Sequence, residues 1–515
     1  MSKRQRKAVF RSYNPDQLSL LPPSLDELIE ENHVVRVVRR VIDDLNIDSI
    51  IKKYKGGGAS SFHPKMMLKI LVYGYLSNIY SSRKIEQAVK SNIQFMWLSG
   101  MQRPDHNTIN RFRNDKLKGV LKEVFAQVVL LMADQGLMDI KTIYVDGTKL
   151  EANANKYTFV WGKSIKRNKE RIKKQLEELW KYAESVAKEE LMDNNPTTFP
   201  VLDAEQVKKT IDSINEAIKD KPVDKKVKQK LNYAKRNWPK NMTKYKEQEK
   251  VLGQRNSFSK TDPDATFMRM KDDHMRNGQL KPGYNWQIST SNQCILNYDI
   301  YHNPTDTLTL PDHINEYKLL YGTTPDILVA DSGYGSEQNY EYLESENVEA
   351  YVKYNYFHKE QKSKGKVKPK DAFKPQNLFY NESEDCFICP MGQKINKRYE
   401  AHPKTKSGYR QTYSVYQAQN CQGCPLRGAC HKSKEDRKFR INWNLKKYKD
   451  KVRDKLLSEK GQAHRSQRPV DVEAVFGNIK RNKNFTRFML RGKENVLIEV
   501  GLLSLAHNLA KMAKN

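Results

Sequence analysis

The chain has 515 residues, and 92 Lys and Arg residues against 61 Asp and Glu residues give it a formal net charge of +31. No apolar run is long enough to span a bilayer, and the basic N-terminus lacks the apolar segment of a secretory signal, so we expect a cytoplasmic protein. The charge argues for a polyanionic partner, and nucleic acid is favoured because its phosphates give affinity at any sequence. A chain of this length accommodates about two to four domains.

The N-terminal region, residues 1–140, is predicted to be helical. Pro64, Ser82 and Pro104 precede three of its helices, and an apolar helix is expected from about residue 120 to 138.

The helix after Pro104 carries polar and basic residues near its start. Because it follows the predicted helix SSRKIEQAVK, it resembles the second helix of a helix-turn-helix, which enters the major groove of DNA. The alternative is a basic helical bundle used for packing or dimerisation. The candidate DNA-binding residues are Thr108, Asn110, Arg111 and Arg113.

Strands and helices alternate in the middle of the chain, which indicates an α/β core. Residues 141–148 are predicted to form a buried strand, residues 284–301 a hairpin, and residues 348–354 a later strand. An inserted helical arm is expected between the first strand and the hairpin. There, apolar residues such as Ile172 and Leu176 recur at steps of three and four among charged positions, as in a coiled coil.

Two acidic residues, Asp146 and Asp331, each end a strongly apolar predicted strand, in the sequences VDGT and ADSGYG. Ligands of open α/β sheets bind at the carboxyl ends of strands, and two close carboxylates repel unless cations lie between them. Oxygen-only ligands suit Mg²⁺ or Mn²⁺. The alternative is that each Asp only caps a helix or turns a loop.

A third acid, Glu473, lies on a predicted C-terminal helix and shares a face with Lys480. Arg468 and Arg481 lie nearby in the sequence. A carboxylate among basic side chains suits a metal ion beside DNA phosphates. The alternative is a surface helix with ordinary ion pairs.

Five of the six cysteines lie in one segment that contains two CxxC pairs. Such pairs indicate Zn²⁺, since each pair supplies two corners of a tetrahedron. The alternative is a set of reduced thiols in a small loop-rich insert. We expect few apolar residues in this segment, so that a metal would supply much of its folding energy. The candidate ligands are Cys386, Cys389, Cys421, Cys424 and Cys430; Cys294 lies in a predicted strand and is not expected to bind metal.

The chain resembles the DDE transposases of bacterial insertion sequences. The resemblance lies in VDGT, DPDA, PGYNWQ, ADSGYG, VEAVFGNIK and FMLRG in this order, and in the N-terminal pieces HPKMMLKILVYGYLSNIYSSRKIEQA and RPDHNTINRFR. It covers most of residues 15–510. It implies an α/β fold: a ribonuclease H-like mixed-sheet catalytic core with an all-α N-terminal domain, an inserted coiled-coil-like helical arm and a small Cys-rich insertion.

The resemblance also implies roles for individual residues. Asp146, Asp331 and Glu473 match the family's acidic triad, which holds Mg²⁺ or Mn²⁺ for two-metal phosphoryl transfer. Lys480 matches the lysine of a related Tyr-Arg-Glu-Lys signature. The resemblance favours, as ligands of one structural Zn²⁺, Cys389, Cys421, Cys424 and Cys430, with Cys386 as the alternate.

At the other positions of that signature, this chain departs from the family. Many members have Arg three intervening residues before the Glu, where this chain has Pro469. Arg468 is the nearest arginine, one position away, and Arg465 is a further candidate for a phosphate contact. The expected upstream Tyr is missing.

The expected organisation follows from these segments. It comprises a helical DNA-binding domain at 1–140, the first parts of the core at 141–157 and 258–357, the arm at 158–257, a Lys-rich loop and Cys-rich insertion at 358–460, and C-terminal core helices carrying the catalytic Glu at 461–515.

The expected function is that of a transposase which binds the terminal inverted repeats of its insertion sequence and catalyses metal-dependent DNA cleavage and strand transfer. Its partners would be double-stranded DNA, as element ends and target, and further copies of itself, with a dimer on DNA and no membrane. It would act in the bacterial cytoplasm at the nucleoid. The alternatives are a non-catalytic DNA-binding protein on a transposase scaffold, and a metal-dependent nuclease without strand transfer.

Overall fold

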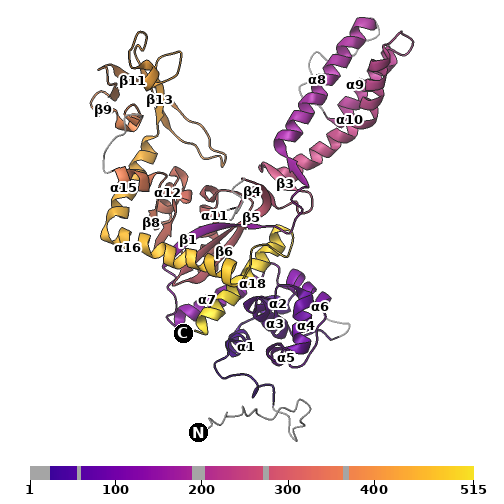
Figure 1. Cartoon of the computed structure of the whole chain (residues 1–515), viewed down its shortest axis with the longest axis vertical. Coiled ribbons are helices and arrows are strands. Elements are labelled where there is room, and N and C mark those ends of the chain that lie inside the picture. Colours follow the sequence, from indigo (N-terminus) through magenta and orange to yellow (C-terminus); the bar gives the residue numbers. More distant parts are fainter. Residues whose placement is uncertain (1–23, 55–59, 188–202, 271–277, 364–370, 515) are drawn as a thin grey trace, which may run out of the picture. The chain divides into compact units, whose positions relative to one another are not determined.

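The computed structural model describes residues 24–54, 60–187, 203–270, 278–363 and 371–514 (Figure 1). The chain divides into two compact units, Met1–Lys116 with Leu509–Asn515, and Leu117–Asn508. In the described ranges no helix has both the length and the apolar composition needed to cross a membrane.

The smaller unit is helical, as predicted. Its longest helix, α3, begins with Pro64 at a position where a missing N–H costs nothing, and most of its residues are buried. The other helices pack around that apolar centre. Its elements are α1 (Val34–Asp44), α2 (Asp48–Ile51), α3 (Pro64–Leu76), α4 (Ser82–Ser91), α5 (Ile93–Ser99), α6 (His106–Arg111) and the π-helical turn η1 (Phe112–Lys116).

A mixed sheet forms the core of the larger unit. Its order is β4-β5-β1-β7-β8, and β6 also pairs with β5, outside this order. β4, β5, β6 and β1 pair antiparallel, whereas β1, β7 and β8 are parallel. The expected ribonuclease H-like mixed sheet is thereby confirmed. The strands are β1 (Thr142–Glu151), β4 (Thr266–Arg269), β5 (Leu280–Ser291), β6 (Cys294–Tyr301), β7 (Ile327–Ala330) and β8 (Glu349–Val352).

Helices cover both faces of this sheet. On one face, Ser289 of β5 contacts His313 of α11; on the other, the neighbouring Thr290 contacts Asp471 of the C-terminal helical segment. Successive side chains of a strand point to opposite faces, so these helices lie on opposite sides. The helical elements are α7 (Leu121–Asp134), η3 (Asp306–Leu308), α11 (Leu310–Tyr321), η4 (Ser332–Tyr334), α12 (Glu337–Ser345), α13 (Phe357–Ser363), α15 (Trp443–Leu457), α16 (Glu459–Arg468), η7 (Pro469–Glu473), α17 (Ala474–Gly477), η8 (Asn478–Asn482) and α18 (Lys493–Met512).

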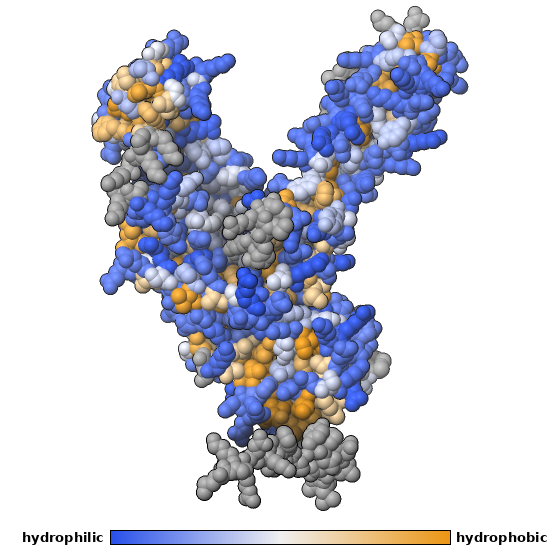
Figure 2. Space-filling view, in the orientation of Figure 1, coloured by the Kyte–Doolittle hydropathy of each residue, from blue (hydrophilic) through white to orange (hydrophobic). Residues whose placement is uncertain are grey.

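The inserted segment forms the predicted helical arm, from α8 (Gly162–Val186), α9 (Ala204–Ala217) and α10 (Lys225–Leu252). The apolar residues of the predicted seam, including Ile172 and Leu176, are buried in a core of the arm's own. The face of the arm seen in Figure 2 is mostly hydrophilic, with small hydrophobic patches that include one near its tip. A short antiparallel pair, β2 (Phe159–Trp161) and β3 (Ser257–Ser259), joins the two chain segments at the base of the arm.

The Cys-rich segment contains a five-stranded antiparallel sheet. It is therefore not the loop-rich insert that was considered as the alternative to a zinc site. The expectation of few apolar residues is wrong, because Phe387 and Tyr416 are buried in an aromatic cluster with Phe439 and Trp443. Burying such side chains contributes about 1.5–3 kcal/mol each, so the sheet has an apolar core independent of any metal. Its elements are η6 (Pro375–Asn377), β9 (Phe379–Asn381), β10 (Cys386–Ile388), β11 (Lys394–Ala401), β12 (Tyr413–Ala418), α14 (Arg427–Cys430) and β13 (Lys438–Ile441), in the order β13-β12-β11-β10-β9.

We expect Phe387→Ala to destabilise this sheet by about 3–5 kcal/mol, since the ring lies 4.8 Å from that of Tyr380 and 4.9 Å from that of Tyr416. Limited proteolysis in a urea series measures the effect. The control is Phe379→Ala on the neighbouring strand, whose side chain is 70% exposed and whose loss should change little. Equal effects of the two variants would contradict an aromatic core, as would a loss that appears only after treatment with a chelator.

Candidate active site

Three residues follow directly from the register of the parallel strands. Val145 pairs with Ala330, and Ala330 pairs with Val352. The next residues along these strands, Asp146, Asp331 and Lys353, therefore lie side by side, about 4.8 Å apart per strand. The structure thus brings the two acids of VDGT and ADSGYG side by side where the parallel pairing of β1 with β7 ends. Asp331 directly follows β7, but the expectation that Asp146 ends its strand is wrong, because β1 continues to Glu151 in its pairing with β5.

The position after Asp146 leaves no room for a side chain, which explains Gly147. A Cβ atom on Gly147 would lie 2.0 Å from Nε2 of Gln287 and 2.7 Å from Oδ1 of Asp306, so no other residue fits without moving them. Gln287 and Asn285 both donate to that Asp306 oxygen at 2.8 Å. This polar cluster packs against Gly147 and fixes the part of β1 that carries Asp146.

The C-terminal segment that carries Glu473 is not a regular α-helix. Residues Pro469–Glu473 form a π-helical turn, because Pro469 has no N–H to donate to the carbonyl of Arg465. In a π-turn, residues five apart are neighbours, as residues four apart are in an α-helix. Arg468 therefore faces Glu473, and its Nη1 donates to Oε1 at 2.8 Å. The wider turn absorbs the single-residue offset seen in the sequence.

Arg468 joins this segment to the sheet. Its Nη2 lies 3.1 Å from Oδ1 of Asp146 while Nη1 contacts Glu473, and its side chain is 3% exposed. One buried guanidinium thus bridges two acids that are more than 300 residues apart in the sequence.

Two further cations lie beside these acids. Nζ of Lys353 is 4.0 Å from Oδ1 of Asp331, and Arg465 stacks over the Phe357 ring at 5.0 Å. Burial lowers the pKa of Lys353, and the charge of Asp331 opposes this shift. Oδ1 of Asp331 also accepts a hydrogen bond from the backbone N–H of Ser332 at 2.7 Å.

The three carboxylates fit the oxygen-rich donor set of Mg²⁺ or Mn²⁺. Their arrangement is nevertheless one of ion pairs with Arg468 and Lys353. Within the described part of the chain, no group of three or more His, Cys, Asp or Glu side chains is close enough to hold a metal ion.

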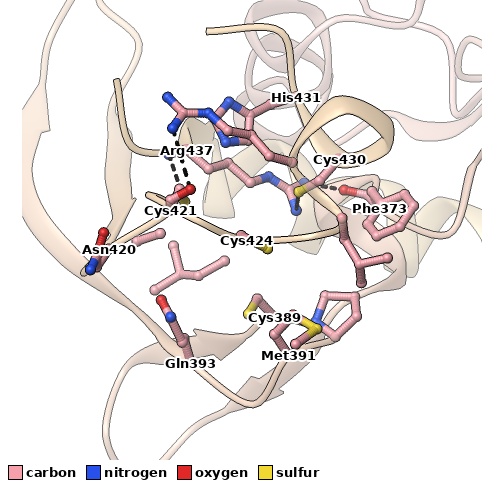
Figure 3. Close-up of a pocket in the computed structure, with 15 residues that line it drawn as sticks. Phe373, Cys389, Met391, Gln393, Asn420, Cys421, Cys424, Cys430, His431 and Arg437 are labelled. Carbon is pink, nitrogen blue, oxygen red and sulfur yellow. Dashed lines mark hydrogen bonds between the residues drawn. The ribbon is translucent and has the colours of Figure 1, made fainter. Parts of the chain in front are cut away.

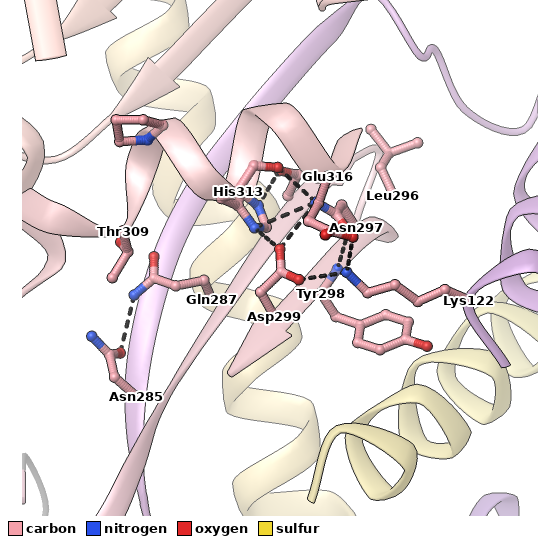
Figure 4. Close-up of polar contacts among 12 residues, drawn as sticks. Lys122, Asn285, Gln287, Leu296, Asn297, Tyr298, Asp299, Thr309, His313 and Glu316 are labelled. Atoms are coloured by element: carbon pink, nitrogen blue, oxygen red, sulfur yellow. Dashed lines mark hydrogen bonds and ion pairs between the residues drawn. The ribbon is translucent and has the colours of Figure 1, made fainter. Parts of the chain in front are cut away.

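A buried Ser-His-Asp chain lies on the face of the sheet opposite the C-terminal helical segment. Figure 4 shows its His313 and Asp299 together with Lys122. Ser289 Oγ is 2.7 Å from His313 Nε2, whose Nδ1 is 2.5 Å from Asp299 Oδ2, and Lys122 contacts the same aspartate. This order matches a hydrolytic triad, but Ser289 and His313 are both 0% exposed, so a substrate cannot reach them. The cluster instead ties α11 and α7 to the sheet.

The predicted DNA-binding residues are not equivalent. Arg111 is exposed at the end of α6, whereas Arg113 is buried in η1 and donates to the carbonyl of Tyr80 at 3.0 Å and to Asn110 at 3.0 Å. Asp105 caps α6 by accepting from the N–H of Thr108. An additional helix, α5, lies between α4 and α6. Farther along, Lys480 is half-buried and Arg481 is exposed on η8.

The Cys-rich sheet carries a small pocket lined by cysteines from three chain segments (Figure 3). Nη1 of Arg437 donates to Cys430 Sγ at 3.1 Å. Burial raises the pKa of the Cys430 thiol, and Arg437 opposes this shift. Cys386 lies apart on β10, where its thiol contacts Glu384 at 3.5 Å, and Cys294 is buried in β6. The pocket cysteines are Cys389, Cys421, Cys424 and Cys430.

Sequence reasoning missed Lys353 and the polar cluster behind Gly147. A signal for Lys353 was available: it lies near the end of the predicted strand 348–354, which pairs in parallel with the strand before Asp331. Gln287 and Asp306 gave none, because an isolated polar residue in a strand or loop carries no pattern.

Two family models match parts of the chain. A model described as a transposase DDE domain matches residues 388–513, which include Glu473, and a model described as a transposase domain (DUF772) matches residues 23–115. No curated protein and no solved structure matches the chain. The two matches indicate an insertion-sequence DDE transposase, and the mixed-sheet core agrees with this.

Proposed function

We propose that this transposase binds the terminal inverted repeats of its insertion sequence, cleaves the DNA there and joins the freed 3′ ends to target DNA. The observation that carries the proposal is the placement of Asp146 and Asp331 on neighbouring strands, with Arg468 paired to both Asp146 and Glu473. Its partners are double-stranded DNA and a second copy of the chain, in the bacterial cytoplasm at the nucleoid.

In the reaction, the oxygen of water, or later of a 3′-hydroxyl, attacks phosphorus and gives up its proton. The bond from phosphorus to the 3′-oxygen breaks, and that oxygen leaves and takes up a proton. Asp146, Asp331 and Glu473 would hold divalent cations such as Mg²⁺ or Mn²⁺, which would supply activation of the nucleophile and neutralisation of the leaving oxygen. Strand β1 and the end of β7 fix the first two acids, and the π-turn fixes the third.

Arg468 is proposed to bind the phosphate beside the cleaved bond. Its Nε is buried and has no hydrogen-bond partner among the residues described, which leaves a donor for a phosphate oxygen. Lys480 and Arg481, one to two turns after Glu473, are proposed to contact the DNA backbone. The N-terminal helices are proposed to read the terminal repeat through the exposed face of α6.

We expect Asp146→Asn, Asp331→Asn and Glu473→Gln each to slow cleavage at least about 100-fold with little change in DNA affinity, because each removes a ligand charge at the reacting phosphate. The assay is single-turnover cleavage of a labelled duplex carrying the element end that flanks this reading frame, with Mg²⁺ and a plasmid target. Glu349→Gln, a surface acid paired with Lys460, is the control.

The same assay separates the alternatives. Cleavage without joining to the plasmid would indicate a nuclease. Binding without cleavage by the unaltered protein would indicate a DNA-binding protein on a transposase scaffold.

We expect Arg111→Ala to cost about 1–3 kcal/mol of affinity for the terminal repeat, because its exposed side chain is free to reach a base. Arg113→Ala should instead lower the melting temperature, since it removes the buried hydrogen bonds to the Tyr80 carbonyl and to Asn110. Fluorescence anisotropy on repeat and random duplexes, together with thermal melting, tests both. Weaker binding by Arg113→Ala at unchanged stability would return this residue to the DNA interface.

A structural Zn²⁺ is also proposed. The four pocket thiols provide the soft donor set that this ion prefers, and Cys386 is outside the pocket. Elemental analysis should find about one zinc per chain, lost in Cys421→Ser and retained in Cys386→Ser. The absence of zinc from protein whose pocket thiols all react freely would contradict this proposal.

A further inference from the structure

We infer that Lys353 is a further DNA-contacting residue of the active site, whose ammonium group binds a phosphate oxygen of the strand being cleaved. This inference rests on the proposed function, since it concerns the same reaction. It adds a basic residue from β8 to a site otherwise built from β1, β7 and the C-terminal segment.

The position of Lys353 follows from strand pairing. Its N–H donates to the carbonyl of Ala330 at 3.3 Å, so it continues the parallel ladder one residue beyond β8. Asp331 is its lateral neighbour, and Asp146 follows on the next strand. A residue on a strand end in the middle of such a row is placed as rigidly as the acids themselves.

The backbone of Lys353 is held from behind as well. A Cβ atom on Gly335 would lie 2.4 Å from the Lys353 carbonyl oxygen, so the ADSGYG turn packs against this strand at a distance that only glycine allows. The hydroxyl of Tyr340 donates to the carbonyl of Val352 at 3.1 Å. The same motif that supplies Asp331 therefore also fixes Lys353.

The charges around Lys353 leave its ammonium group short of partners. Its side chain is 12% exposed, and in the described ranges its nearest anion is Asp331, at 4.0 Å. That distance is longer than a hydrogen bond, and an ammonium group has three donors. The cations Arg465 and Arg468 lie close enough to act on its charge. Glu473 also acts on the charge of Lys353. If Asp331 and Glu473 hold divalent cations, a DNA phosphate is the anion that Lys353 would meet.

The competing explanation is that Lys353 only neutralises Asp331 and so stabilises the fold. Lys460 provides a matched control, because it makes an ion pair of 2.6 Å with Glu349 at the opposite end of β8. A lysine with a purely structural role should affect melting temperature. A lysine on the phosphate should affect DNA binding and the rate of cleavage.

The test compares Lys353→Met with Lys460→Met on the labelled element-end duplex. Binding is measured over a salt series with Ca²⁺ in place of Mg²⁺, and cleavage with Mg²⁺ in single turnover. We expect Lys353→Met to lower the log–log salt slope by about 0.9, the value for one lost phosphate contact. We expect it to slow cleavage about 10- to 100-fold. Lys460→Met should change neither quantity.

An unchanged slope and rate in Lys353→Met would overturn the inference. So would a lowered melting temperature that Asp331→Asn restores while the slope stays that of the wild type. If Lys353→Met does not fold, Lys353→Gln takes its place. Failure of the unaltered protein to cleave would refute the proposed function alone, because the salt series still reports whether Lys353 contacts DNA.

Discussion

The pairing of the buried Arg468 with the largely buried Asp146 and the exposed Glu473 is the interaction on which the arrangement of the site depends. Two carboxylates drawn together repel each other, and a guanidinium between them removes that repulsion. Removing one partner from a buried ion pair is strongly destabilising, because the charge left behind has no water to solvate it. The same cation that organises the acids is thus also the group best placed to meet an incoming phosphate.

The position of Arg468 depends in turn on Pro469. A proline inside a helix ordinarily weakens it, since a hydrogen bond is lost. Here the loss is accommodated by a π-turn, whose wider backbone spacing aligns Arg468 with Glu473. Such turns are frequent at functional sites, where they aim a side chain that a regular helix would direct elsewhere. Arg468 is one position away from the arginine of the family signature, and yet it contacts Glu473.

Much of the fold could be predicted from local patterns. The apolar residues before Asp146 were sufficient to predict strand β1, and the three-and-four spacing around Leu176 was sufficient to predict a helix of the arm. Both patterns reflect burial of the apolar side chains. The rest depends on long-range pairing that leaves little trace in sequence. The strands around Phe387 alternate poorly, and Arg113 resembles any basic surface residue until its buried partners are known. Assigning residues to a helix face by α-helical spacing also fails at Pro469, because the number of residues per turn changes in the π-helical turn that begins there.

The base of the helical arm has a consequence for how such proteins diversify. Because β2 and β3 pair with each other, the chain leaves and re-enters the core at adjacent points, and the arm encloses its own apolar core. Its length is therefore mechanically uncoupled from Asp146 in β1. Seven residues added to each long helix would extend it by roughly 10 Å. That is the rise of about three base pairs of DNA, so indels here are a route to altered reach that leaves the chemistry intact.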